Sequence, residues 1–218
     1  MLAIAIAIVA VGPSTAHAQV HGDLGFQGGV ERPLFGGGAG SGAFGPRLGV
    51  DAHVALLPLV RIGAYTAFAI APTSDAAPAR HVLSAGAHAK ILAPWVRGDF
   101  RLWLGVGAGY AAIYAPSYRT TVVVTHADGS PPTPTDALVI GAGGGRLEVP
   151  VGLGGAWRFR KPWALTLEIG ALFGFAHTGS VYTGRHAYLA GDDFAQNVAA
   201  LGKDYVTPFA TAGVSLDL

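Results

Sequence analysis

Apolar and polar residues alternate along residues 146–159, near the middle of the chain. Successive side chains of a β-strand point to opposite faces, so this alternation predicts a strand with one apolar face and one charged or small face. An ordinary strand has about five or six residues, whereas a tilted strand that crosses a lipid bilayer needs about 9–11. The length of this stretch is therefore typical of a membrane-spanning strand. The apolar parity carries Leu147, Val149, Val151, Leu153, Trp157 and Phe159.

Seven further segments alternate in the same way, and they cover residues 20–32, 47–57, 60–71, 81–92, 100–115, 164–175 and 205–218. The connections between consecutive segments are alternately long and short. Transmembrane barrels have this rhythm, with short periplasmic turns and longer extracellular loops. An even number of strands would leave both chain ends on the periplasmic side. Within the longest loop, residues 119–125 and 138–140 are expected to extend a hairpin beyond the membrane.

Aromatic residues gather near both ends of the predicted strands, as the two interfaces of a membrane require. The short-turn end carries Phe100, Trp157, Phe159 and Trp163, with Trp95 nearby, and the long-loop end carries Phe68, Tyr110, Tyr114, Phe173 and Phe175. A soluble β-sandwich is the alternative that would also alternate. It would need neither long strands throughout nor aromatic residues at both ends.

Composition narrows the choice further. Hydrophobic residues make up 51% of the 218 residues and charged residues only 12%, against about 25% charged in soluble domains. Outside the N-terminus no apolar run reaches 18 residues, so barrel strands rather than membrane helices account for this hydrophobicity. A formal charge of +1 argues against nucleic-acid binding. The absence of cysteine excludes disulfides, thiol catalysis and thiolate metal sites.

The N-terminal residues predict export. An apolar run at residues 2–11 is about as long as the core of a signal peptide, and Ala16-His17-Ala18 is an acceptable cleavage site. We therefore expect a cleaved signal peptide over residues 1–18 and one domain over residues 19–218. The predicted fold is all-β: an eight-stranded antiparallel up-and-down transmembrane β-barrel, preceded by this signal peptide.

The polar parity of the predicted strands would face the barrel interior, where eight strands leave room for side chains alone. Buried charges must be paired and hydrogen-bonded, and acids and bases are nearly balanced. We therefore expect a structural ion-pair network that plugs the lumen. Four of its bases lie near the short turns, so a site that attracts anions there is the alternative. The predicted network comprises Glu31, Arg47, Asp51, Arg61, Lys90, Arg101, Arg146, Glu148, Arg158 and Glu168, with Asp23 on the same parity.

No catalytic residue, metal site or cofactor is predicted. His177 and Ser180 near the outer rim, with Glu168 further down the strand, do not match a Ser–His–carboxylate motif. Asp192, Asp193 and Asp204 do not have the spacing of a calcium loop. The eight histidines show no paired spacing typical of zinc ligands, and the glycine runs do not precede a helix as phosphate loops do.

Over residues 20–218 the chain resembles the small eight-stranded outer-membrane proteins, through this pattern of strands and loops rather than through a diagnostic motif. Such proteins include structural barrels, adhesins and small-solute pores. The resemblance implies an outer-membrane location, with membrane lipid and the barrel-insertion machinery as partners. We expect a non-enzymatic protein with a structural or surface-interaction role and an unidentified loop ligand. The alternatives are a narrow channel or carrier for small solutes and a lipid-modifying enzyme.

Two features depart from the regular pattern. Leu218 ends the chain where such proteins usually have an aromatic residue. Pro150 lacks the N–H that a closed ladder of strands requires. We therefore expect a β-bulge at Pro150, near the outer rim.

Overall fold

A computed structural model describes residues 21–35, 43–72, 78–94, 98–124, 129–183, 185–189, 195–198 and 203–218. The expected signal peptide lies outside these residues. In the part of the chain that is described, no helix has the length and apolar character needed to cross a membrane.

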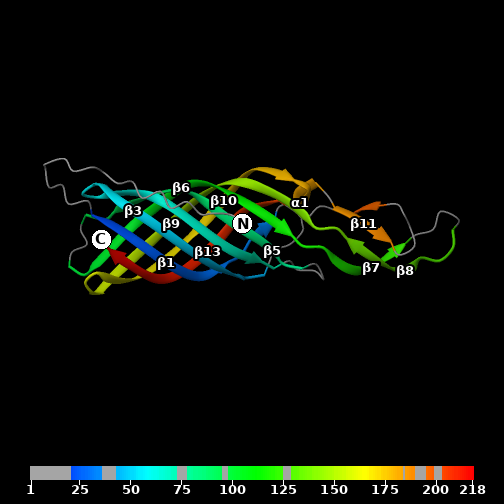
Figure 1. The fold of residues 1–218 in the computed structure, drawn as a ribbon, viewed down its shortest axis with the longest axis horizontal. Helices are drawn as coiled ribbons and strands as arrows, with labels where there is room; N and C mark the ends of the chain where they lie inside the picture. Colours follow the sequence, from blue (N-terminus) through cyan, green and yellow to red (C-terminus); the bar gives the residue numbers. More distant parts are fainter. Residues whose placement is uncertain are drawn as a thin grey trace.

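The described residues form a closed antiparallel barrel of eight long strands (Figure 1). Each of these strands pairs with the next one along the chain, and the last pairs with the first to close the ring. The predicted all-β barrel and its number of strands are therefore confirmed. The strands are β1 (Gly22–Glu31), β3 (Gly45–Leu57), β4 (Val60–Ala71), β5 (Arg80–Leu92), β6 (Phe100–Ala115), β9 (Ala142–Arg160), β10 (Trp163–Gly179) and β13 (Asp204–Asp217).

Both ends of the barrel chain lie at one rim, which we call the inner rim. Gly22 and Leu218 exchange two backbone hydrogen bonds there, of 3.1 and 2.9 Å. The three short connections, β3–β4, β5–β6 and β9–β10, turn at this rim, and the four long connections start from the opposite, outer rim. The predicted alternation of long and short connections is confirmed.

A second, four-stranded sheet extends beyond the outer rim (Figure 1). It contains β7 (Tyr118–Val124), β8 (Thr133–Val139), β11 (Arg185–Leu189) and β12 (Ala195–Val198), in the order β12-β11-β8-β7. The β7–β8 hairpin was expected from the sequence. Its extension by two strands from the β10–β13 connection was not, because those strands are short. The two-residue strand β2 (Leu34–Phe35) pairs with the outer end of β13.

Outward positions of the barrel strands carry exposed apolar side chains. The predicted aromatic residues at both ends are among them, with exposed fractions from 38% to 58%. Phe100 and Trp157 are paired across β6 and β9, and their stacked rings have centroids 6.2 Å apart. Trp95 lies outside the described residues. The outer surface of the barrel is therefore an apolar belt bordered by aromatic residues.

Glycines on β6, β9 and β10 make room for large side chains inside the barrel. A Cβ atom on Gly154 would overlap the ring of Trp103, which is 6% exposed. This explains how an apolar residue occupies the otherwise polar parity of β6. In the same way, Gly109 lies against the Tyr65 hydroxyl and Gly105 lies against the His88 ring. Large side chains from other strands therefore occupy the interior space beside these glycines.

The β-bulge expected at Pro150 is wrong. The β6–β9 ladder passes from the Val106–Val151 pair to the Gly109–Glu148 pair without a change of register. The proline ring points inward against Gly107, where a Cβ atom would lie 2.9 Å from Pro150 Cγ. A glycine partner therefore accommodates the proline. The register between β9 and β10 shifts elsewhere, between Trp163 and Ala164 and between Phe175 and Thr178. The second shift lies next to Ala176, whose φ is 47°.

Candidate functional site

All ten residues of the predicted network lie on inward strand positions, and nine of them form ion pairs among the described residues. The pairs fall into three layers from the outer rim to the inner rim. Each layer joins strands that are distant in the sequence.

The outer layer contains two separate groups. Arg47 Nη1 lies 2.7 Å from Glu31 Oε2, and both side chains are buried. Glu148 accepts a hydrogen bond of 2.9 Å from the Tyr65 hydroxyl, and its other oxygen lies 3.8 Å from Arg146. Arg146 also pairs with Asp204 of β13. Two buried bases are thus matched by three buried acids.

The central layer is the most densely connected. Asp23 pairs with Arg61 and lies 3.4 Å from Lys90 Nζ. Lys90 approaches Asp51 more closely, with 2.5 Å between Nζ and Oδ2, and lies 5.2 Å from the centre of the Trp103 ring. His53 Nδ1 lies 3.1 Å from Asp23 Oδ1 and 3.2 Å from Asp51 Oδ2. This layer therefore joins β1, β3, β4, β5 and β6.

The inner layer is built on Asp217. Its Oδ1 accepts a hydrogen bond of 2.8 Å from Arg101, and its Oδ2 accepts one of 3.0 Å from Arg158 Nε. Arg61 Nη1 lies 4.0 Å from Oδ1. The four bases that suggested an anion site, Arg61, Lys90, Arg101 and Arg158, therefore each face a carboxylate.

An apolar cluster closes around the outer end of the interior, above the charged layers. A short helix, α1 (Ser180–Thr183), leads the β10–β13 connection over the barrel, and its Val181 and Tyr182 are 0% and 5% exposed. The Tyr182 hydroxyl donates a hydrogen bond of 3.1 Å to Asp204, and burial raises the pKa of Tyr182. We call this group the outer cap; its other members are Ala69, Ala71, Val82, Ala111, Ile113, Ala115 and Ala142.

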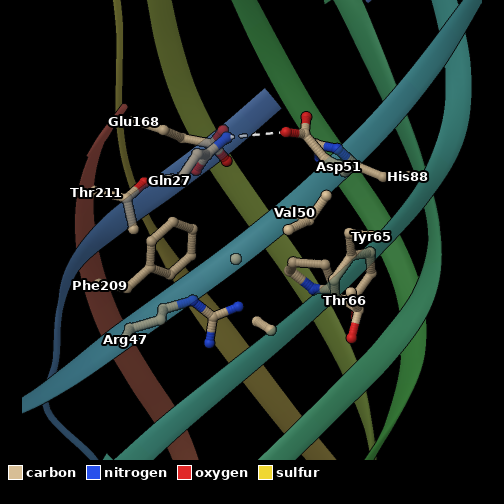
Figure 2. Close-up of a pocket in the computed structure, with 13 residues that line it drawn as sticks. Gln27, Arg47, Val50, Asp51, Tyr65, Thr66, His88, Glu168, Phe209 and Thr211 are labelled. Atoms are coloured by element: carbon tan, nitrogen blue, oxygen red, sulfur yellow. Dashed lines mark hydrogen bonds between the residues drawn. The ribbon is translucent and has the colours of Figure 1, made fainter. Parts of the chain in front are cut away.

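An interior cavity of about 60 Å³ lies between the outer and central layers (Figure 2). In Figure 2, Gln27 and Glu168 approach it from one side, and Tyr65 and His88 approach it from the other. Glu168 is the member of the predicted network that forms no ion pair with any described residue. A cavity of this size is large enough to hold water.

The candidate catalytic residues do not meet in the described structure. His177 Nε2 lies 3.2 Å from the backbone oxygen of Asp204, and its ring packs against Tyr182 and Tyr205. Ser180 donates a hydrogen bond of 3.3 Å to the backbone oxygen of Gly143. Asp204, weighed above as a calcium ligand, faces Arg146 instead, and Asp192 and Asp193 lie outside the described residues.

Several interior residues were not singled out from the sequence. Asp217 is the acid of the whole inner layer, and the alternation of the last strand places it on the inward parity. His53 and His88 approach each other, with 3.1 Å between Nε2 and Nδ1, although 34 residues separate them in the chain. Their separation along the chain explains why the spacing of the histidines did not suggest this contact. β3 and β5 flank β4, and this adjacency brings the two rings together.

No protein-family model matches the sequence, and no curated protein matches it. Solved structures match the fold. The crystal structure of Neisserial surface protein A aligns with a TM-score of 0.52 at 12% identity, covering 91% of this chain and 97% of that chain. The fold is that of the small outer-membrane β-barrels. A major outer membrane protein from Thermus thermophilus aligns with a TM-score of 0.54 at 11% identity, covering 91% of this chain and 99% of that chain.

Proposed function

We propose that this protein is a non-conducting barrel of the outer membrane whose role is structural or surface-interacting, through the sheet beyond its outer rim. The observation that carries the proposal is the outer cap, in which Val181 and Tyr182 pack into the barrel above paired charges. A diffusion pore would need a continuous polar path through both.

The outer surface of the barrel supports the proposed location. Leu48, Leu102, Leu153 and Leu167 are between 49% and 62% exposed on four different strands. An exposed apolar belt of this kind would be unfavourable in water, whereas lipid solvates it. This belt supports a membrane location, and we propose the outer membrane, with its lipids and the barrel-insertion machinery as partners. Heat-modifiable gel migration tests the proposed location. The protein should be found in the membrane fraction, and its gel mobility should change on boiling. A protein found in the soluble fraction, with no change of mobility on boiling, would overturn the proposed location.

The sheet beyond the outer rim supports the surface role. It holds its own buried cluster, Ala137, Val139, Ala187 and Leu189, with Tyr118 and Val124 packed against it. Val123 on its edge strand is 70% exposed. The sheet is therefore a packed unit that presents side chains outside the membrane, rather than a part of the barrel wall.

Planar-bilayer recording tests the closed lumen. The wild-type barrel should give no sustained single-channel events. A matched variant with Val181→Ala and Tyr182→Ala loses the two helix side chains of the outer cap but keeps every ion pair of the inner layer. Sustained events in the wild type would overturn the proposal in favour of a narrow channel for small solutes.

A hairpin exchange tests the surface role. Replacing residues 118–139 by a short turn should leave the heat-modifiable migration of the barrel unchanged, because those residues pair only within the second sheet in the described structure. Aggregation or adhesion of cells that expose the wild-type protein should be lost with the exchanged protein. Equal adhesion by both would remove the surface role. Hydrolysis of lipid A that depends on Ser180 and His177 would instead support the enzyme alternative.

A further inference from the structure

Two histidines and an aspartate converge at the centre of the barrel. One ligand atom from each of Asp51, His53 and His88 lies within 4.8 Å of the others. The geometry has a simple origin: Asp51 and His53 are two residues apart on β3 and so share the inward face. His53 and His88 both pair with Gly63 of the intervening strand β4. With no side chain on Gly63, the two rings meet across it.

We propose that Asp51, His53 and His88 bind a divalent transition-metal ion, with Zn²⁺ as the best match. Imidazole nitrogens and carboxylate oxygens are ligands that zinc uses, at bond lengths of about 2.0–2.1 Å. Two such bonds at a tetrahedral angle put the ligand atoms roughly 3.3–3.4 Å apart. The distance between His53 Nε2 and His88 Nδ1 is 3.1 Å. The two rings therefore need to separate by only a few tenths of an ångström.

The remote nitrogen of His53 is already oriented as a metal ligand requires. His53 Nδ1 lies 3.1 Å from Asp23 Oδ1, and the side chain of His53 is fully buried. A carboxylate that accepts the Nδ1 proton leaves the Nε2 lone pair free to bind a metal, and metal-binding histidines in proteins usually have such a partner. In this protein, Nε2 is the nitrogen that faces His88. Asp23 is thus a positioning residue for the proposed site.

Asp51 can contribute an oxygen without losing Lys90. Its Oδ2 lies 2.5 Å from Lys90 Nζ, whereas its Oδ1 accepts a longer hydrogen bond of 3.3 Å from Gln27. The Oδ1 atom is therefore the one available to a metal. Asp51 and His88 also line the interior cavity, so a water molecule there can complete a four-coordinate site.

The charge balance at the centre favours a cation. Asp23 and Asp51 pair with Arg61 and Lys90. Glu168 is a third carboxylate there, and the cation that lines its cavity, Arg47, pairs with Glu31. Glu168 lines the cavity together with Asp51 and His88 and is 7% exposed. A buried carboxylate is costly unless a cation offsets its charge. A bound divalent ion would add positive charge beside Glu168, which forms no ion pair with any described residue.

Metal titration of the refolded, untagged chain in detergent micelles tests the site. Calorimetry with Zn²⁺ should give one ion per chain, and Co²⁺ in its place should show the absorption of a tetrahedral complex. At a free Zn²⁺ concentration of 100 times Kd, the folded-to-unfolded ratio should rise about 100-fold. His53→Gln and His88→Gln should each abolish the calorimetric Zn²⁺ binding and the Co²⁺ absorption. His81→Gln is the matched control, because His81 lies on the same strand as His88 but is exposed on the outer face.

Two results of these titrations would overturn the proposal. One is a wild-type chain that takes up no Zn²⁺, in which case the histidines are hydrogen-bond partners only. The other is unchanged binding in both glutamine variants. If those variants do not refold, Cu²⁺ bound to the wild-type chain decides the question. Electron paramagnetic resonance should show coupling to two imidazole nitrogens, and a spectrum without that coupling refutes the site.

Discussion

Neutralising one partner of the Glu31–Arg47 pair should destabilise the barrel strongly. Both side chains are buried, with 2% and 9% of their surfaces exposed, and their charged atoms are 2.7 Å apart. The Arg47 guanidinium also lies 5.4 Å from the centre of the Phe209 ring, so it is held in a partly apolar place. Glu31→Gln would leave this cation buried without its carboxylate.

The size of the effect follows from that burial. Removing one partner of a buried ion pair costs about 3–5 kcal/mol, because the remaining charge stays desolvated. Replacing both partners with apolar residues of similar size is often nearly neutral. We therefore expect Glu31→Gln to lower the free energy of unfolding by about 3 kcal/mol or more. The double variant Glu31→Leu with Arg47→Met should stay within about 1 kcal/mol of the wild type.

Urea unfolding in detergent or lipid, followed by heat-modifiable gel migration, measures both variants. With a slope of about 1–3 kcal/mol per molar urea, a loss of 3 kcal/mol lowers the midpoint by about 1 M or more. Arg160→Met is the matched control, since Arg160 is exposed at the inner rim, and its midpoint should not move. The reasoning is refuted if Glu31→Gln unfolds at the wild-type midpoint. It is also refuted if the double variant is less stable than Glu31→Gln.

Three further predictions concern other parts of the barrel. Gly154→Ala should lower the free energy of unfolding by about 1–3 kcal/mol, because the new Cβ atom would overlap the Trp103 ring. Gly143→Ala is the control and should change the free energy of unfolding little, because nothing lies within 4 Å of a Cβ atom at Gly143. Equal effects of the two substitutions would contradict the packing argument. In single-tryptophan variants, brominated lipid should quench the fluorescence of Trp157, which is 46% exposed, far more than that of Trp103, which is 6% exposed; similar quenching would contradict the assigned faces. Burial raises the pKa of Tyr182 above its ordinary value of 10.0, so the stability linked to its neutral form is complete below pH 10 and is lost as the pH rises through the raised pKa. Urea midpoints measured from pH 9 upward should therefore fall less steeply for Tyr182→Phe than for the wild type, and identical slopes would count against this assignment.

The strand pattern needed no tertiary information. A β-strand sends alternate side chains to opposite faces whatever its neighbours are, so local sequence predicts which residues face outward. The same regularity placed Arg101 and Arg158 inside. The short turns around Pro58 and Pro162, set against long loops elsewhere, also indicated which rim holds both ends of the chain.

The irregularities were harder to predict, because each depends on a partner strand. Pro150 suggested a bulge when its own strand was considered alone. Its neighbour Gly107 on β6 leaves room for the ring, and the register is kept. One of the two register shifts between β9 and β10 lies instead beside Ala176, where nothing in the local sequence marks it. Likewise, the sequence of the β10–β13 connection predicts a polar loop, although its Val181 and Tyr182 are buried in the outer cap.

The alternation of side chains is enough to predict that these charges face inward, whereas the closed barrel establishes which of them meet. Asp217 lies at the end of the chain, yet its partners are Arg101 and Arg158 on β6 and β9. His53 of β3 and His88 of β5 lie close together because both pair with Gly63 of the strand between them, β4, and glycine has no side chain to separate the two rings. The physical reason is that alternation is a property of one strand, whereas an ion pair or a ligand set depends on the register between strands. Closure of the barrel sets that register.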